Sequence, residues 1–336
     1  MERIFDGAVP GHLRGGVVAL GNFDGFHRGH QAVVGDALAR ARAAGRPALV
    51  ATFDPHPARL FRPDLPPFAL TSTEQKLDLL AAFGIDGAVV MHFDAAFAAL
   101  SAEAFVGDWL GGAIGARALV SGADFTFGAK RAGDTAALAR IGADHGIAAH
   151  VVGAVADPDG IVSSSRVRDL LRAADPAGGA ALLTRPFTLR GVVGHGAKLG
   201  RTLGFPTANL VLDDYLRPAY GVYAVRVTLD DGQVADGVAN LGIRPMIEPP
   251  LELLEVNLFD WRGDLYGRTI DVALIAFLRP EWKLDGLDAL TRQIAADCNA
   301  ARAALAAQPA HAALADNATA SSIARQAGTG AARRSA

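Results

Sequence analysis

The sequence predicts an α/β fold whose first half is a doubly wound parallel sheet and whose second half is a small antiparallel β-barrel with a helix near its end. Two observations carry this prediction. As far as residue 152, apolar runs of strand length alternate with helical segments. From residue 187 onward, strand-like runs follow one another, separated by turn signals, before a single late helix. Alternation is typical of parallel sheets, and consecutive strands are typical of barrels.

The elements expected in the first half follow from apolar runs and helix-capping signals. The strands are residues 17–20, 48–53, 88–91, 118–120 and 148–152. The helices between them are residues 30–44, 71–84, 102–110 and 135–145. Short connections in the order strand, helix, strand imply parallel pairing with right-handed crossovers, and such sheets bind ligands at the carboxyl ends of their strands.

The second half is expected to begin after a joint at residues 175–186, which is rich in small residues and proline. Its expected strands are residues 188–193, 222–229, 234–241, 253–259 and 269–277, with a helix at residues 287–305. We therefore expect domains at residues 1–183 and 184–307. Residues 308–336 have almost no large apolar side chain, and we expect them to form a disordered tail.

Composition excludes several classes of protein. The 336 residues are enough for two domains of ordinary size. The chain has no long uninterrupted apolar run and no signal peptide, so we expect a cytoplasmic protein that does not engage a membrane. The single Cys298 fits a reducing compartment. A net charge of -3 without a basic stripe argues against nucleic acid as a partner, and we expect a monomer or a weak homo-oligomer.

The stretch LGNFDGFHRGH, residues 20–30, follows the first strand and leads into a helix. The amino end of a helix attracts anions, and Gly29 has no Cβ to keep the backbone away from a phosphate. His27 and His30 can both donate hydrogen bonds to phosphoryl oxygens, which matters most where charge builds in a transition state. The pattern His-x-Gly-His is typical of nucleotidyltransferases, in which an acceptor phosphate attacks the α-phosphorus of ATP.

The tetrapeptide His-x-Gly-His also fits two alternatives. A glycine-rich turn with two surface histidines is the simpler of them, because short motifs often arise by chance. A class I aminoacyl-tRNA synthetase uses a similar tetrapeptide, but no segment like Lys-Met-Ser-Lys-Ser follows here.

A second stretch, SSSRVR at residues 163–168, precedes a short helix. Three hydroxyls at a helix start are explained by capping alone, but together with a guanidinium they also suit the outer phosphates of ATP.

With this stretch, the sequence resembles the bifunctional riboflavin kinase/FAD synthetases of bacteria. That family carries Gly-x-Phe-Asp-Gly-x-His-x-Gly-His near its start and Ser-Ser-Thr-x-x-Arg at the end of its first domain. Here Ser165 stands in place of the threonine, and Arg168 aligns with the motif arginine. The resemblance implies that His27 and His30 are catalytic. The ATP contacts that it implies are Gly21, Phe23, Asp24, Gly29, Ser163, Ser164, Ser165 and Arg168.

Two further loops gain a role from the resemblance. TFDPHP at residues 52–57 and GADFTFG at residues 122–128 would otherwise read as loops with aromatic anchors. In the family they line the flavin and adenine sites, which makes Asp124, Phe125 and His56 candidate flavin contacts. His56, between two prolines, is also explained by fixing its loop.

The barrel half carries GRTLGFPTAN at residues 200–209, which looks like the riboflavin kinase signature. Thr207 and Asn209 offer neutral oxygen ligands of the kind that Mg²⁺ accepts. The glycine-rich residues 191–200 can surround phosphates with backbone N–H groups. The expected ATP contacts are Gly196, Lys198, Gly200, Arg201, Pro206 and Asn209. No Gly-x-x-x-x-Gly-Lys-Ser/Thr pattern occurs, which excludes an ordinary P-loop kinase.

A kinase that phosphorylates a primary alcohol benefits from a carboxylate that orients the hydroxyl and accepts its proton. Glu252 and Glu255 lie three apart when this expected strand is extended to residues 251–259, so they face opposite sides and only one can point into a site of the barrel. The resemblance assigns the base to Glu255. Ile243, Met246 and Leu284 depart from the usual family residues beside the flavin pocket.

The resemblance implies two ATP-dependent reactions: phosphorylation of riboflavin to FMN with Mg²⁺, and adenylyl transfer to FMN that gives FAD and pyrophosphate. One alternative keeps only adenylyl transfer, and another makes the barrel a flavin-binding sensor. Both alternatives predict that riboflavin and ATP give no ADP.

Overall fold

The structure is a computed structural model, and it describes residues 1–336 apart from 7, 196–204, 245–250, 284 and 309–336. The described chain divides into two compact units. The first comprises Met1–Pro66 and Thr73–Val162, and the second comprises Pro67–Ser72 and the chain from Ser163 onward. The tail expected at residues 308–336 lies outside the described residues, apart from Gln308.

A six-stranded sheet forms the centre of the first unit, and all of its strand pairs are parallel. Its strands are β1 (Glu2–Phe5), β2 (Val17–Leu20), β3 (Ala48–Asp54), β4 (Gly87–His92), β5 (Ala118–Gly122) and β6 (Ala148–Val152). The order β1-β4-β3-β2-β5-β6 confirms the predicted doubly wound sheet. Apolar runs do not predict β1, because three of its four residues are exposed.

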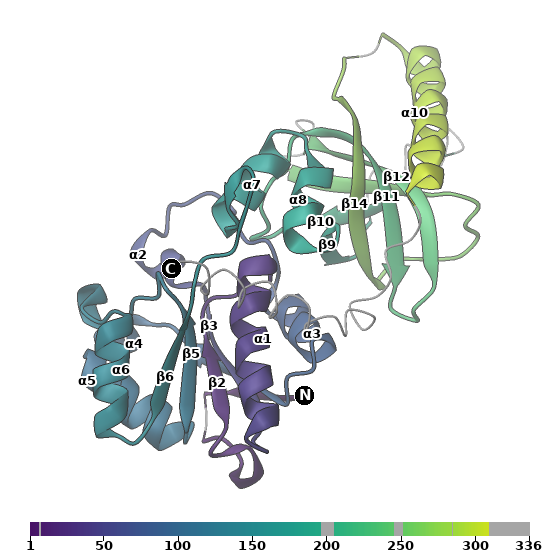
Figure 1. The fold of residues 1–336 in the computed structure, drawn as a ribbon. Helices are drawn as coiled ribbons and strands as arrows, with labels where there is room; N and C mark the ends of the chain where they lie inside the picture. The colour runs from purple at the N-terminus through teal and green to yellow at the C-terminus, as the bar shows by residue number, and fades with distance from the viewer. Residues whose placement is uncertain (7, 196–204, 245–250, 284, 309–336) are drawn as a thin grey trace, which may run out of the picture. The chain divides into compact units, whose positions relative to one another are not determined.

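Helices cover both faces of this sheet (Figure 1). They are α1 (Arg28–Ala43), α2 (Pro57–Phe61), α3 (Thr73–Ala82), α4 (Ala95–Ala98), α5 (Ala102–Ala104), which continues as the π-helix η2 (Phe105–Ala113), and α6 (Thr135–Asp144). The shorter elements are the 3-10 turns η1 (Gly11–Leu13) and η3 (Ala129–Arg131) and the hairpin of β7 (Ala156–Asp157) and β8 (Gly160–Ile161). Helices α1 and α3 pack on one face, and η2 and α6 pack on the other.

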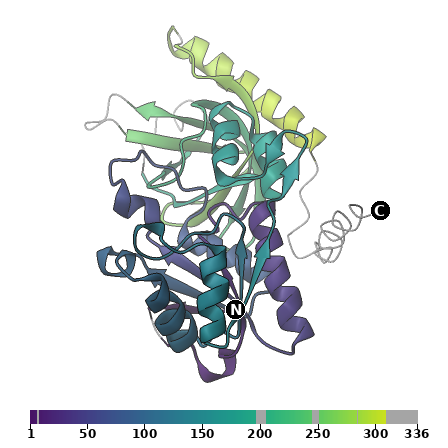
Figure 2. The same cartoon turned by 60° about the vertical axis from the view of Figure 1, so that its left-hand side comes forward.

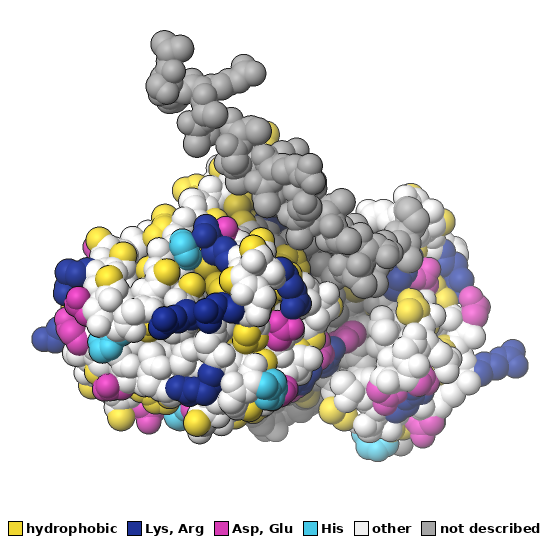
Figure 3. Space-filling model, turned by 60° about the horizontal axis from the view of Figure 1, so that its bottom comes forward, with side chains coloured by type: hydrophobic (Ala, Val, Ile, Leu, Met, Phe, Trp, Pro, Cys, Tyr) yellow, Lys and Arg dark blue, Asp and Glu magenta, His cyan; other side chains and the backbone are white. Residues whose placement is uncertain are grey.

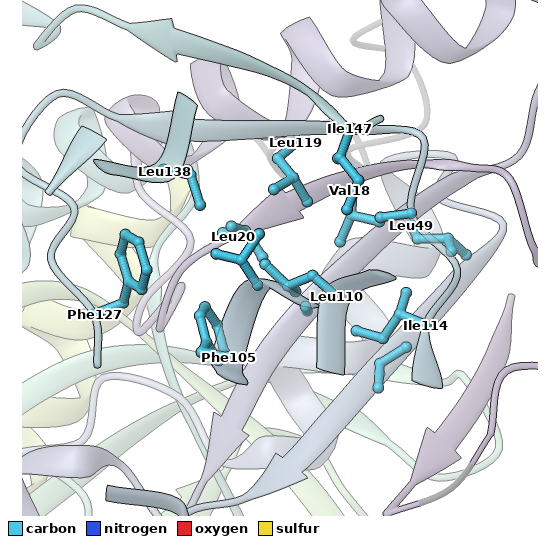
Figure 4. Close-up of a cluster of buried hydrophobic side chains, with 14 of the residues drawn as sticks. Val18, Leu20, Leu49, Phe105, Leu110, Ile114, Leu119, Phe127, Leu138 and Ile147 are labelled. Carbon is cyan, nitrogen blue, oxygen red and sulfur yellow. The ribbon is translucent and has the colours of Figure 1, made fainter. Parts of the chain in front are cut away.

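The side chains between the sheet and η2 and α6 form a continuous apolar core (Figure 4). Leu20 of β2 and Leu119 of β5 meet Leu110 of η2 and Leu138 of α6, and all four are at most 2% exposed. Burying one such leucine contributes about 1.5–3 kcal/mol. This core makes the sheet a rigid support for the loops at its carboxyl edge.

The strand order places two loops side by side at that edge. Strand β2 lies between β3 and β5, and Leu20 is in register with Ala51 and Ser121. The chain leaves β2 toward one face of the sheet and leaves β5 toward the other. A doubly wound sheet binds ligands where its connections diverge in this way. The loops at residues 21–27 and 122–128 both begin at this point.

The second unit is built on an antiparallel six-stranded sheet that closes almost into a barrel. Its strands, in the order β10-β13-β12-β11-β14-β9, are β9 (Phe187–Val192), β10 (Ala208–Val211), β11 (Gly221–Leu229), β12 (Val234–Arg244), β13 (Leu251–Leu258) and β14 (Thr269–Pro280). A bridge between Gly194 and Asn209, with a 2.9 Å hydrogen bond, joins the two edges. The predicted barrel is confirmed, and β10 is an additional strand that begins at the end of the expected kinase signature.

Helix α10 (Leu287–Ala307) lies along the outer wall of the barrel (Figure 2). Ala301 and Leu305 pack on Val222 and Val238, which face outward from β11 and β12. A bidentate ion pair from Arg279 to Asp297, at 2.8 and 2.7 Å, ties β14 to the same helix. The interior of the barrel is filled by the alternate residues of each strand.

Two segments before the barrel also belong to the second unit: helices α7 (Ser164–Arg172) and α8 (Pro176–Leu183). The joint expected at residues 175–186 is therefore largely a helix, because Asp175 caps it and Pro176 suits its first turn. Pro67–Ser72 pairs with the residues before β11 through hydrogen bonds from Ala69 N to Asp214 O and from Leu216 N to Ala69 O.

The face of the molecule in Figure 3 carries basic and acidic side chains intermixed.

Candidate active sites

His27 holds the loop of residues 21–27 at the start of α1. Its Nδ1 accepts hydrogen bonds from the N–H groups of Gly29 (3.1 Å) and His30 (3.4 Å), which makes it the N-cap of the helix. Such a cap pairs amides that the helix cannot pair itself. Because Nδ1 is the acceptor, the proton of the neutral imidazole lies on Nε2. Nε2 is therefore the N–H donor of this ring.

His30 stacks on His27, with ring centroids 3.7 Å apart and an angle of 20° between the planes. The edge of Phe23 meets His30 at 5.4 Å. Both imidazoles thus lie at the amino end of α1, where the helix dipole favours an anion. The structure brings the two predicted catalytic histidines into direct contact, and their roles stay predictions.

Gly21 in this loop and Gly29 in the first turn of α1 each leave room for a neighbouring ring. A Cβ on Gly29 would lie 3.0 Å from the His27 ring and 3.3 Å from the Val162 carbonyl oxygen. A Cβ on Gly21 would lie 3.0 Å from Phe23. Phe23 is 1% exposed and belongs to the core, so only its backbone is left for the predicted ATP contact. Asp24 is buried beside it.

The loop after β5 carries the predicted flavin contacts. Asp124 is exposed, and Phe125 is half-buried and stacks on Phe127 with centroids 5.8 Å apart. His56 lies at the end of β3, where its Nδ1 accepts a 3.1 Å hydrogen bond from Ala58 N and caps α2. The structure therefore gives His56 a loop-fixing contact, and its flavin contact stays a prediction.

A chain of aromatic rings, which no sequence motif groups, runs from this loop across the first unit. Neighbouring centroids are 5.1 to 6.0 Å apart. At one end Phe61 is 66% exposed. The rings belong to Phe53, Phe61, Phe93, Phe97, Phe105, Trp109, Phe125 and Phe127. The sequence offered one indication of this chain of rings: Phe53 lies near the end of β3 and Phe93 just after β4, so both lie at the carboxyl edge of the sheet.

The stretch at residues 163–168 starts α7 in the second unit. Ser163 is its N-cap and accepts a 3.3 Å hydrogen bond from Arg166 N, as simple capping predicts. Arg168 donates a 2.9 Å hydrogen bond to the Phe68 carbonyl and lies over the Phe68 ring at 5.3 Å. The roles of Ser163, Ser164, Ser165 and Arg168 in binding ATP stay predictions.

Three polar residues form one row across the outer wall of the barrel. Glu255 on β13 is in register with Asn209 on β10 and with Asn240 on β12. Their neighbours in sequence, such as Leu254 and Val256, are fully buried in the barrel. The row therefore faces outward, and the predicted kinase base lies on the wall of the barrel rather than in its interior.

Asn240 has an incompletely satisfied side chain in this row. Its Nδ2 donates a 3.0 Å hydrogen bond to Glu281, while its Oδ1 is buried and has no hydrogen-bond partner within the described residues. A Cβ on Gly242 would lie 2.1 Å from Glu281, so this carboxylate covers the glycine. Sequence reasoning missed Asn240 as a site residue, although it is the asparagine of the divergent segment containing Ile243.

Glu252 has a different environment on the opposite face of β13. It pairs with Arg217 at 2.7 Å and accepts a hydrogen bond from the Tyr220 hydroxyl. Burial opposes ionisation, but these two hydrogen bonds lower the pKa of Glu252 below its ordinary value. Burial, followed by the bond to Glu252, raises the pKa of Tyr220 to about 12. Glu252 is thus committed to structural contacts.

A solvent-open pocket is lined in part by Thr207. Its lining residues include Pro206, Trp261 and Tyr266. Trp261 Nε1 is buried without a hydrogen-bond partner in the described part of the chain. The other predicted ATP contacts, Gly196, Lys198, Gly200 and Arg201, lie outside the described residues, as do Met246 and Leu284.

Two family models match successive parts of the chain. The family model described as FAD synthetase matches residues 9–166, and that described as riboflavin kinase matches residues 183–305. A bifunctional riboflavin kinase/FMN adenylyltransferase of Escherichia coli is 40% identical over 283 residues, which are 84% of this chain and 90% of the relative. One from Pseudomonas fluorescens is 42% identical over 304 residues, 90% of this chain and 96% of the relative.

A crystal structure described as a macrolide-efflux protein from Streptococcus pneumoniae has the same fold, with a TM-score of 0.80 and 32% identity over 90% of this chain and 99% of that one. Among the described residues, no helix is both long and apolar enough to cross a bilayer. The two family matches and the identity to relatives that are covered to 90% or more lead to one assignment. The chain belongs to the family of bifunctional riboflavin kinase/FMN adenylyltransferases.

Proposed function

We propose that the first unit transfers AMP from ATP to FMN and that the second phosphorylates riboflavin, each with the residues described above. One observation carries the first assignment. His27 caps α1 through Nδ1, which places its imidazole ring at the amino end of that helix and at the point where the sheet connections diverge. This is the geometry of an anion site that adds a side-chain donor to a helix amino end.

In the adenylyl transfer, a phosphate oxygen of FMN attacks the α-phosphorus of ATP. The new P–O bond joins the two phosphates of FAD, and the bond to the leaving oxygen breaks to release pyrophosphate. Negative charge builds on the α-phosphoryl oxygens during this exchange. His27 and His30 act as hydrogen-bond donors to those oxygens, and neither needs to become a covalent nucleophile.

The aromatic chain supports FMN as the acceptor. The isoalloxazine ring is flat and largely apolar, and aromatic side chains bind such rings by stacking. Phe61 and Phe93 are accessible members of the chain, and Phe125 brings it to the loop after β5. Asp124, exposed in the same loop, offers a carboxylate to polar ring edges.

In the kinase reaction, the terminal ribityl oxygen of riboflavin attacks the γ-phosphorus of ATP, so that FMN and ADP are released. The Glu255 carboxylate orients that hydroxyl and accepts its proton. Asn240, whose Oδ1 has no hydrogen-bond partner among the described residues, is suited to hold a hydroxyl of the substrate beside Glu255. The pocket beside Thr207, with Trp261 and Tyr266 in its lining, suits the planar base of ATP.

Magnesium is the metal that this second site fits. Thr207 and Asn209 supply hydroxyl and amide oxygens, which are hard donors of the kind that Mg²⁺ accepts. Asn209 and Glu255 are in register on adjacent strands. When bound there, Mg²⁺ would neutralise charge on the phosphates of ATP.

Four other expectations from the sequence remain predictions. They are the domain limits at residues 183 and 184, a cytoplasmic location, the absence of a nucleic-acid partner, and a monomeric or weakly oligomeric state.

The variant His27→Asn tests the adenylyl-transfer site. Asparagine is a good N-cap, so it keeps the helix start that an alanine would weaken by about 1 kcal/mol. Its remaining donor, Nδ2, lies closer to the backbone than Nε2 of His27 and does not reach the same position. We expect FAD formation from FMN to fall about 100- to 1,000-fold, while riboflavin phosphorylation continues. His12→Ala, an exposed histidine of the same unit, is the control. Normal FAD synthesis by His27→Asn would refute the assignment.

A further inference from the structure

Lys76 on α3 is a buried cation in the first unit. The side chain is 7% exposed, and its ammonium lies within hydrogen-bond distance of three oxygens. These are Thr52 Oγ1 at 3.0 Å, the Asn22 carbonyl at 3.2 Å and the Phe53 carbonyl at 3.4 Å. An ammonium group has three N–H donors, so these oxygens can accept all of them.

The three acceptors come from two separate segments of the carboxyl edge. Asn22 belongs to the loop that leads to His27, whereas Thr52 and Phe53 belong to the end of β3. Thr52 also donates a 3.1 Å hydrogen bond to the same Asn22 carbonyl. Lys76 therefore joins the start of the histidine loop to the neighbouring strand.

Burial of a lysine requires compensation, because an unpaired charge is costly away from water. Burial lowers the pKa of Lys76, and the negative charges of Asp24 and Asp54 act in the opposite direction. Asp24 lies in the histidine loop and is itself 6% exposed. The aliphatic core around α3, which includes Leu77 and Leu80, has no need of a cation at this position. Neither the fold nor the proposed roles of the histidines accounts for it.

We propose that Lys76 is a positioning residue for adenylyl transfer, holding the loop of residues 21–27 against the end of β3 so that the His27 donor meets the α-phosphoryl group. This inference rests on the proposed function of the first unit. Lys76 acts through the Asn22 carbonyl and the charge of Asp24, without itself contacting the reacting atoms. Loss of the Lys76 hydrogen bonds would let the loop shift, and a displacement of about 1 Å at a catalytic donor can lower the rate about 100-fold.

The first test compares Lys76→Met with the wild type. Methionine fills a similar volume but removes the charge and the donors. We expect kcat for FAD formation from FMN to fall about 100-fold, because one anchored loop carries the donors that act in the transition state. KM for FMN and the rate of riboflavin phosphorylation should stay within about threefold. A purely structural lysine would lower the unfolding temperature and leave kcat unchanged at a temperature where the variant is folded.

A second variant covers the case in which Lys76→Met does not fold. Thr52→Val keeps the shape of a fully buried side chain but removes one acceptor of Lys76 and one donor to Asn22. Its matched control is Ser121→Ala, since Ser121 is equally buried and its hydroxyl has no hydrogen-bond partner within the described chain. We expect kcat to fall about 10-fold for Thr52→Val, as for a lost bond to a charged group, and to stay unchanged for the control.

The outcomes separate this inference from the function on which it rests. If the wild-type chain made no FAD from FMN and ATP, the proposed function would fail. If the wild type were active and folded Lys76→Met kept a normal kcat, or if Thr52→Val matched Ser121→Ala, only the role of Lys76 would be overturned.

Discussion

Replacing Glu255 by glutamine tests the chemistry of the barrel unit through a single functional group. The side chain lies between Asn209 and Asn240 on the outer wall, and glutamine keeps its size and can hydrogen-bond to both neighbours. The substitution removes the proton acceptor and the negative charge. Loss of a general base typically costs about 100- to 10,000-fold in rate, which is about 3–5 kcal/mol of transition-state stabilisation. FMN formation from riboflavin should therefore nearly cease.

Glu252→Gln is the matched control, because it makes the same chemical change three residues away on the opposite face of β13. Glu252 pairs with Arg217 and Tyr220, so its loss should cost about 1 kcal/mol of stability and change the kinase rate less than threefold. The assay follows FMN and ADP from riboflavin and ATP, with FAD formation from supplied FMN as the internal reference. Equal effects of the two variants, or a larger effect of Glu252→Gln, would refute the assignment of the base.

Two further predictions concern acid stability and flavin binding. The pKa of Glu252 is lower in the folded chain than in an unfolded one, so its contribution to stability is complete near neutral pH and is lost as the pH falls through and below about 4.5. The difference in unfolding temperature between the wild type and Glu252→Gln should accordingly shrink in acid, and a difference that grew would contradict the ion pair. Phe61→Ala removes the exposed end of the aromatic chain. It should raise KM for FMN about 10-fold, as expected for one lost stacking contact, and should change KM for riboflavin little. An unchanged KM for FMN would show that Phe61 does not contact the flavin.

Sequence patterns predict the elements that bury apolar runs and miss those that do not. The strands β2 to β5 contain continuous apolar runs, and the predicted bounds of β2 to β6 lie close to the observed ones. Strand β1 is mostly exposed, and β10 lies within a motif interpreted only for its chemistry. Helix α8 contains two glycines and a proline, which indicate a joint until Asp175 caps it and Leu182 and Leu183 are buried.

The candidate sites divide in the same way. The histidines could be found because a motif holds them within four residues of sequence. Lys76, Asn240 and the aromatic chain could not, because their partners are brought together only by the pairing of strands. The two-residue period of a strand predicts which face of β13 carries Glu255, but it does not predict the neighbours on adjacent strands. The register of β13 against β10 and β12 shows that these neighbours are Asn209 and Asn240.

The most direct test of two separate sites is a time course of the purified full chain with riboflavin, ATP and Mg²⁺, in which all products are separated and quantified. We predict that FMN and ADP appear first and that FAD and pyrophosphate follow. The His27→Asn variant should convert riboflavin to FMN but form almost no FAD. The Glu255→Gln variant should form FAD only when FMN is supplied. Formation of FAD from supplied FMN without any ADP or FMN from riboflavin would contradict the proposed pair of activities, because the barrel would then not phosphorylate riboflavin.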